Sequence, residues 1–274
     1  MSTDVKDAVK DKYASVAARR SRNASGSESD LAQAFGYSDG ELHSIPEEAN
    51  LGVSCGNPTA MADLLPGEVV VDLGSGGGLD VFLAAHKVGS SGRAIGIDMT
   101  PEMVELASRN LRKSSFDNVE FHLAEIEAMP LESNSVDCVI SNCVLNLVPD
   151  KAKAFSEIHR ILKPGGRLVV SDIALLEKPP PELEQSVRGL TGCIAGAILT
   201  SSYREMLAEA GFSSIEITDM RRDLNVYREL RAPDVENLPT SASVVPRDAH
   251  DEMPADTDFD VNRYAASVKV LAVK

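Results

Sequence analysis

The sequence predicts an α/β fold in which a mainly parallel sheet is covered by helices on both faces. One observation is the alternation of short, strand-like apolar segments with amphipathic helical segments between residues 69 and 172. In such an alternation, crossover helices join parallel strands and cover the sheet. The other is the segment VVVDLGSGGGLD at 69–80, which predicts a buried strand, a glycine-rich turn and the start of a helix. Open α/β sheets bind ligands beyond the carboxyl ends of their strands, so we expect a ligand site at this turn.

Apolar periodicity and turn residues place the individual elements. We expect seven strands, at 69–73, 93–98, 119–123, 136–141, 167–172, 213–218 and 265–273. We expect helices at 79–88, 101–113, 150–162 and 203–210, with a short helix just before the first strand. The helix at 150–162 has clear signals, because Asp150 lies at its start, Phe155 and Ile158 form a core face, and KPGG ends it.

The chain divides into three predicted parts. Residues 1–50 contain a helix and a flexible lid segment, 51–220 form the core, and 221–274 contain an acidic loop at 231–262 and the last strand. The first helix, at 4–20, places Val5, Val9, Tyr13 and Val16 on one face. This face suits either a helix docked through Tyr13 or a lid over the glycine turn. Residues 21–30 are polar and predict a flexible connection.

Composition argues against several kinds of partner. The formal net charge of -15 disfavours nucleic acid and anionic membrane surfaces, which are themselves negative. No apolar run approaches the length of a membrane span, and the charged N-terminal segment does not resemble a signal peptide. We therefore expect a cytoplasmic protein whose four cysteines are reduced thiols unless catalysis oxidises them.

The glycine turn suits S-adenosylmethionine (SAM) better than a dinucleotide. The glycines do not continue as G-x-G-x-x-G, and the carboxylate of Asp72 just before them would repel a pyrophosphate. The same carboxylate suits a ligand that carries an ammonium group and a sulfonium. Asp98 ends the second strand, where it can accept both hydroxyls of a ribose, and Met99 can pack on an adenine face.

Five segments resemble, in order and spacing, the motifs of class I SAM-dependent methyltransferases: VVVDLGSGGG, IGIDMTPEM, FHLAEIEAMP, SVDCVISNCV and HRILKPGGRLVVSD. The resemblance implies a Rossmann-like fold with a seven-stranded sheet. It also implies a cofactor site in which the glycine turn meets the methionine portion, Asp98 holds the ribose and the fourth strand closes the pocket. The cofactor-binding residues expected on this basis are Tyr13, Asp72, Gly74, Ser75, Gly76, Asp98, Met99, Glu125, Ile126 and Asn142. Glu127 is expected to face solvent.

A closer resemblance, over about 50–212, is to the arsenite methyltransferases, through segments such as LGVSCGNPTA, ISNCVLNLVPDK and GCIAGA. It implies that Cys55, Cys143 and Cys193 bind trivalent arsenic and act in catalysis. Thiolates are the soft ligands that such a centre prefers. The expected partners are arsenic delivered as a thiol or glutathione conjugate, and a thiol reductant such as thioredoxin or glutathione. Many members of that family carry further cysteines before the position of Cys55, and this sequence has none.

Other interpretations of these cysteines stay open at this point. Cys138 lies within the fourth strand, on the face that we assign to Val136 and Ile140, so we expect it to be a core thiol. Cys143 alone suits a core as well as a site, Cys55 suits a turn and Cys193 suits helix packing. A zinc site is disfavoured, because the C-x4-C spacing is unusual and no histidine is near in sequence. The alternative functions are methylation of an organic small molecule such as a quinone precursor, or metalloid sequestration without transfer.

Overall fold

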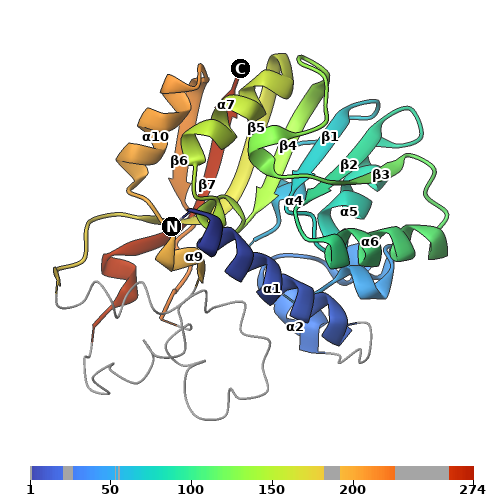
Figure 1. The fold of residues 1–274 in the computed structure, drawn as a ribbon, viewed down its shortest axis with the longest axis horizontal. Helices are drawn as coiled ribbons and strands as arrows, with labels where there is room; N and C mark the ends of the chain where they lie inside the picture. Colours follow the sequence, from blue (N-terminus) through green and yellow to red (C-terminus); the bar gives the residue numbers. More distant parts are fainter. Residues whose placement is uncertain (1, 21–26, 53, 55, 182–191, 226–258) are drawn as a thin grey trace.

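In the computed structural model, residues 2–20, 27–52, 54, 56–181, 192–225 and 259–274 are described. They form a seven-stranded sheet in the order β3-β2-β1-β4-β5-β7-β6 (Figure 1). All pairings are parallel except those of β7, which runs antiparallel to β5 and β6. The strands are β1 (Val69–Leu73), β2 (Arg93–Asp98), β3 (Val119–Leu123), β4 (Val136–Asn142), β5 (Leu162–Leu175), β6 (Ser213–Asp219) and β7 (Ala265–Val273). The prediction of a mainly parallel, seven-stranded sheet is confirmed.

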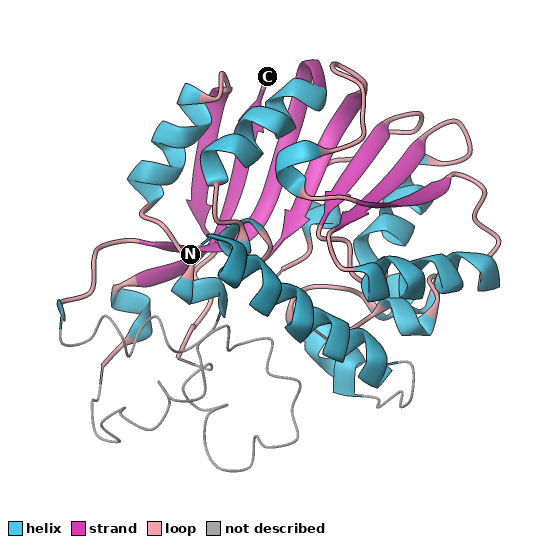
Figure 2. Cartoon of the chain, in the orientation of Figure 1, coloured by secondary structure: helices cyan, strands magenta, loops and turns pink. Residues whose placement is uncertain are grey.

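Helices lie on both sides of this sheet (Figure 2). The helices of the N-terminal region are α1 (Ser2–Arg20), α2 (Ser27–Ala34), α3 (Asp39–His43) and α4 (Pro58–Met61). Those that follow are α5 (Leu79–Val88), α6 (Pro101–Lys113), α7 (Lys151–Ile161), α9 (Gly192–Ala195) and α10 (Thr200–Glu209). Single turns of 3-10 helix occur at η1 (Glu47–Ala49), η2 (Ile126–Ala128), η3 (Leu145–Leu147) and η6 (Val261–Arg263).

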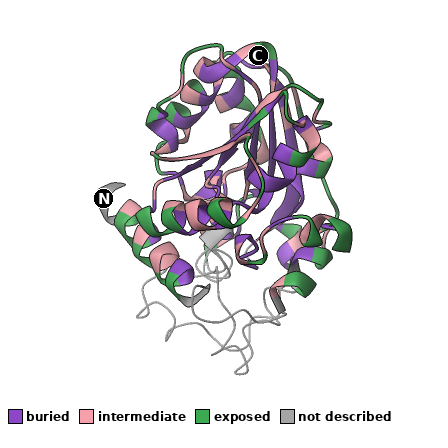
Figure 3. Ribbon diagram, turned by 90° about the vertical axis from the view of Figure 1, so that its right-hand side faces the viewer, coloured by how far each residue is buried: buried purple, intermediate pink, exposed green. Residues whose placement is uncertain are grey.

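Alternation along the strands divides the core into two layers, one on each face of the sheet. Val70, Cys138 and Ile140 pack on one face against the apolar side of α5. Val71 and its counterparts on neighbouring strands pack on the other face, against Phe155 of α7. Figure 3 shows these buried strands between helical layers in a view turned by 90°. Cys138 is fully buried, and burial raises the pKa of its thiol to about 12, so the core interpretation of this cysteine is confirmed.

Four predictions about local structure are wrong in part. The helix ends before KPGG as predicted, but the strand expected at 167–172 is longer, because β5 begins at Leu162 and includes KPGG. Residues 27–30 are not a flexible connection, since α2 begins at Ser27. Val136 does not share the face of Cys138, because the register of β4 on β5 shifts between these two residues. The acidic loop lies outside the described residues as far as 258, and 261–263 form η6.

The sheet register brings the ends of three strands to one edge. Leu73 of β1 lies opposite Ile97 of β2 and Ser141 of β4. The residues that follow these positions therefore leave the sheet side by side. Gly74 makes the turn with a φ of 66°, and a Cβ at this position would lie 2.5 Å from a methyl carbon of Val144. The turn thus needs glycine both for its backbone conformation and for its approach to the segment after β4.

Among the helices that the structure describes, none has the length and apolar character needed to cross a membrane.

We expect Phe155→Ala to lower the free energy of unfolding by about 3–5 kcal/mol, because it leaves a cavity between α7 and the sheet. Phe155 is fully buried, and its ring centroid lies 5.2 Å from that of Tyr203. Urea unfolding measures the change. Ser156→Ala, at the exposed neighbouring position, is the matched control and should change stability by less than about 0.5 kcal/mol. Equal stabilities of the two variants would contradict this account of the core.

Candidate functional site

A cavity lies at the edge of the sheet where β1, β2 and β4 end. Its walls come from α1, the glycine turn, the segments after β2 and β3, and the residues that follow β4. The sequence-predicted residues that line it are Tyr13, Gly74, Gly76, Asp98, Met99, Ile126, Asn142 and Cys143. The fold therefore gathers residues from five separate parts of the chain into one site.

Three predicted cofactor residues do not line this cavity. Asp72 is buried behind the turn, inside the end of β1. Ser75 is also buried, and its hydroxyl lies close to Gly96, where a Cβ would be 2.6 Å from the Ser75 Oγ. Glu125 lies outside the cavity, with a side chain 40% exposed that pairs with Lys6 Nζ at 2.6 Å. The hydrogen bond from Lys6 is also the main cause that lowers the pKa of Glu125.

The prediction that Glu127 faces solvent is wrong. Glu127 lines the cavity, its side chain is 6% exposed, and it pairs with Lys6 Nζ at 2.9 Å. Lys6 thus bridges both carboxylates from α1. Lys6 was missed in the sequence, although it precedes Val9 and Tyr13 by three and seven positions and so lies on the same side of a helix.

Helix α1 packs against the protein core and also forms part of the cavity wall. Val9 and Val16 are buried, and Val16 packs with Leu106 of α6. Through these contacts the helix packs on the rest of the protein. One wall of the cavity is formed by Lys6, Val9 and Tyr13, so the helix also covers the cavity. The remaining space is about 100 Å³. Pockets for small molecules usually measure about 300–1,000 Å³. The cavity is therefore smaller than a ligand of nucleoside size requires, and α1 forms one of its walls, so both the docking and the lid interpretations of this helix stay predictions.

Three carboxylates are buried around the glycine turn. Burial raises the pKa of Asp72 well above its usual value, and the charges of Asp80 and Asp98 raise it further. Burial also raises the pKa of Asp80, to about 6. Burial raises the pKa of Asp98 too, against the opposing effect of N–H groups from Gly76 and Thr100, which donate to its oxygens at 3.0 and 2.8 Å. Such a cluster favours a cationic ligand, because a positive charge relieves the cost of ionising all three.

Cys143 is the predicted thiol that the structure places best. It directly follows β4, lines the cavity, and is 4% exposed. Its φ of 58° is unusual for a residue with a side chain, and its N–H donates to the Ser171 carbonyl at 2.8 Å. Backbone strain of this kind clusters at functional sites. Cys143 is disulfide-bonded, in contrast to the reduced thiol expected, whereas Cys138 is free.

The other two predicted cysteines cannot be placed in the same way. Cys55 lies outside the described residues, and the side chain of Cys193 is not described. Among the described residues, no group of His, Cys, Asp and Glu side chains is arranged to hold a metal ion.

Sequence analysis also missed Tyr37 and Asp80. The Tyr37 hydroxyl donates to both carboxylate oxygens of Asp80, at 2.9 and 3.0 Å, and both residues are buried. Asn142 donates to this pair from the end of β4. The available signal was Asp80 itself, a carboxylate within the otherwise apolar first turn of α5.

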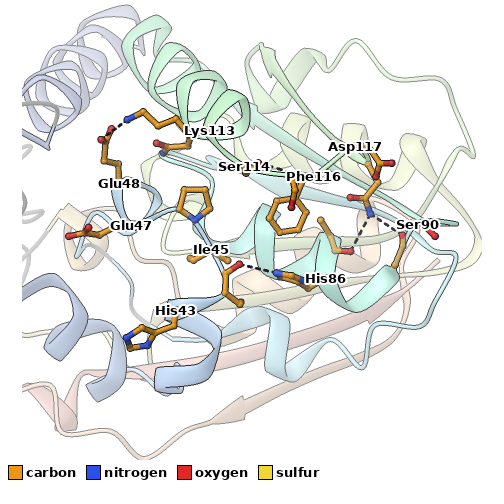
Figure 4. A pocket seen from close by; sticks show the side chains of 17 residues that line it. His43, Ile45, Glu47, Glu48, His86, Ser90, Lys113, Ser114, Phe116 and Asp117 are labelled. Atoms are coloured by element: carbon orange, nitrogen blue, oxygen red, sulfur yellow. Dashed lines mark hydrogen bonds and ion pairs between the residues drawn. The ribbon is translucent and has the colours of Figure 1, made fainter.

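A second hollow, of about 910 Å³, contains none of the predicted site residues. It lies between α3, η1 and the ends of α5 and α6 (Figure 4). Several of its polar groups bond to neighbouring protein groups: His86 to the carbonyl of Ser44 at 2.9 Å, and Lys113 to Glu48 at 2.8 Å. The geometry therefore does not favour it over the cavity beside the glycine turn.

Residues 64–211, more than half of the chain, match the methyltransferase domain family. The chain belongs to this methyltransferase family. An arsenite methyltransferase of Halobacterium salinarum is 44% identical over 205 residues, which are 70% of this chain and 52% of that protein. A human arsenite methyltransferase is 36% identical over 152 residues, 52% of this chain and 40% of the human protein. The chain thus spans about half the length of the curated relatives it matches.

A solved structure supports the same relationship. The crystal structure of an arsenic(III) SAM methyltransferase from Chlamydomonas reinhardtii superposes with a TM-score of 0.60 and 28% identity. The match covers 89% of this chain and 73% of that chain.

The polar, acidic and apolar groups at the cavity of this methyltransferase suit the parts of SAM that they would bind. Asp98 combines a buried carboxylate with N–H groups that hold it in place, an arrangement suited to accepting two ribose hydroxyls. The buried acids at the turn suit the ammonium and sulfonium charges. Met99, Met103 and Ile126 supply apolar surface for an adenine ring.

We expect the affinity for SAM to weaken by several-fold to about tenfold between pH 7.5 and 5.5. Acids with a raised pKa take up protons as the pH falls, and Asp80, with a pKa of about 6, does so within this range. A neutral carboxyl group attracts a cation less. Isothermal titration calorimetry measures the change. S-adenosylhomocysteine (SAH), which lacks the sulfonium charge, should show a weaker pH dependence, and a SAM affinity that is constant over this range would contradict the electrostatic account.

Proposed function

We propose that this protein methylates trivalent arsenic with SAM as the methyl donor. The observation that carries the proposal is the position of Cys143, whose side chain lines the cavity that also contains Gly74 and Asp98. A sulfur at this place lies at the carboxyl end of β4, next to the region assigned to the methionine portion of SAM. The similarity to arsenite methyltransferases supports the choice of arsenic as substrate.

A second cysteine sulfur reaches Cys143. A disulfide joins two sulfurs at about 2 Å. Cys138 is free and lies in the core, so it takes no part in this disulfide. This supports the idea that the thiols proposed to bind arsenic can gather at one point, as a shared ligand requires. We propose that Cys55, Cys143 and Cys193 together hold the substrate.

The chemistry demands positioning more than acid–base catalysis. SAM supplies a methyl group that is electrophilic because it is attached to a sulfonium. Arsenic(III) bound to thiolates keeps a lone pair and has no proton to lose, so the reaction requires no general base. The protein has to hold the arsenic with its lone pair directed at the methyl carbon, and such alignment alone can lower a barrier by several kcal/mol, about 7–11 in the best cases.

The partners follow from the same thiol chemistry. We propose that arsenic arrives as a thiol or glutathione conjugate, which exchanges its thiols for the cysteines of the site. A thiol reductant such as thioredoxin or glutathione would return oxidised cysteines to the thiol form. The cytoplasm provides such reductants and is the compartment we propose. The division of the chain at residues 50 and 220 also stays a prediction.

We expect Cys143→Ser to lower methylarsenical formation at least about a hundredfold, because a serine oxygen is a poor ligand for a soft centre. Arsenic speciation after incubation with arsenite, a thiol and SAM measures the product. SAH binding should stay within about twofold, since the cofactor contacts are unchanged. Cys55→Ser and Cys193→Ser should lose activity in the same way, and Cys138→Ala, in the core, is the matched control.

Four outcomes would contradict the proposal. Undiminished activity of Cys143→Ser would remove its role as ligand, and loss of SAH binding along with activity would assign it to the cofactor site. Tight arsenite binding by the wild type without SAH production would indicate sequestration. Methylation of a quinone precursor but not of arsenite would favour the organic-substrate alternative.

A further inference from the structure

A buried hydrogen-bonded cluster links the N-terminal region to the end of β4. Tyr37, which follows α2, is 2% exposed and donates its hydroxyl proton to the carboxylate of Asp80. Asn142, the last residue of β4, directs its side-chain nitrogen at the same pair. This Nδ2 lies 3.0 Å from the Tyr37 hydroxyl oxygen and 3.3 Å from Asp80 Oδ2. Three distant parts of the sequence are thus joined by hydrogen bonds in which Tyr37 and Asp80 are buried.

The cluster also holds the chain on both sides of residue 55. The Nδ2 of Asn142 donates to the carbonyl oxygen of Gly56 at 2.8 Å. On the other side of residue 55, the Ser54 side chain hydrogen-bonds with the hydroxyl of Tyr37. Residues 54 and 56 are therefore both tied to the end of β4, the strand that Cys143 follows.

Gly56 is held from a second direction as well. A Cβ at this position would lie 2.1 Å from the hydroxyl oxygen of Ser171, so the backbone of Gly56 lies directly on β5. Ser171 is also the residue whose carbonyl accepts from the N–H of Cys143, at 2.8 Å. The backbones of Gly56 and Cys143 thus both contact Ser171 of β5.

We propose that Tyr37, Asp80 and Asn142 are positioning residues, which fix Ser54 and Gly56 beside the end of β4, the strand that Cys143 follows, and so set the geometry of the methyl-acceptor site. The inference rests on the function proposed above, because it treats Cys143 as a ligand of the substrate. These residues do not contact the reacting atoms themselves. They limit how far Ser54 and Gly56 can move, because several hydrogen bonds would have to break together inside the protein. Burial of an unpaired hydroxyl or amide would be costly, so the cluster favours a single arrangement.

Tyr37→Phe tests this role, because it removes the hydroxyl that links Asp80, Asn142 and Ser54 and keeps the ring. We expect kcat/KM for arsenite to fall about tenfold to a hundredfold, the range associated with misplacement of reacting groups. SAH affinity should change less than about twofold. In hydrogen exchange followed by mass spectrometry, the peptide at 51–57 should exchange faster than in the wild type.

Tyr203→Phe is the matched control. Tyr203 is equally buried, on α10, and its hydroxyl has no hydrogen-bond partner in the described part of the chain. It should behave as the wild type in both measurements. Asp80→Asn should give a smaller loss than Tyr37→Phe, because its amide oxygen still accepts from Tyr37.

The two measurements separate this inference from the proposed function. A Tyr37→Phe variant with wild-type exchange at 51–57 overturns the inference, whatever its activity. Faster exchange with unchanged kcat/KM also overturns it, since fixing Ser54 and Gly56 would then not matter for the reaction. If the wild type forms no methylarsenical, the proposed function fails, and the exchange data alone decide whether the cluster fixes Ser54 and Gly56.

Discussion

The parallel pairing of β1 with β2 on one side and with β4 on the other determines where the candidate site lies. Because Leu73 is level with Ile97 and Ser141, the chain leaves all three strands at one edge. The strand order reverses between β1 and β4, and open α/β sheets bind their ligands at such a reversal. Asp98, Asn142 and Cys143 therefore converge at the glycine turn although they are remote in the sequence. The glycines allow this convergence, because a side chain at Gly74 would collide with Val144.

Features that oppose folding accumulate at this edge. Asp72, Asp80 and Asp98 are buried close to one another, and burial raises the pKa of each. Burying carboxylates costs free energy unless they are paired or protonated. Cys143, the residue after Asn142, whose side chain contacts Asp80, adds a strained backbone conformation. Neither feature is needed by the two apolar cores, which hold the sheet together. A ligand site explains both, since a cationic donor compensates the carboxylates, and the strained residue Cys143 lines the cavity.

Much of the fold could be predicted because its signals are local. β7 has the bounds expected from its alternation, and Cys138 is the core thiol that its place in β4 indicated. Asp150 accepts from the N–H of Lys153 and caps α7 at the expected place. Predictions failed where a distant segment decided the outcome. Glu127 is buried because Lys6 of α1 reaches it.

The sequence by itself determined the order of strands and helices, the glycine turn and the types of side chain available to a ligand. These depend on periodicity and turn chemistry, which act over a few residues. Only the tertiary structure decided which of those side chains meet. It put Asn142 against Tyr37 and Gly56, placed Cys143 beside the cavity, and moved Glu125 out of it. Such contacts depend on strand register and on how α1 docks, and both are set by packing between segments that no local pattern connects.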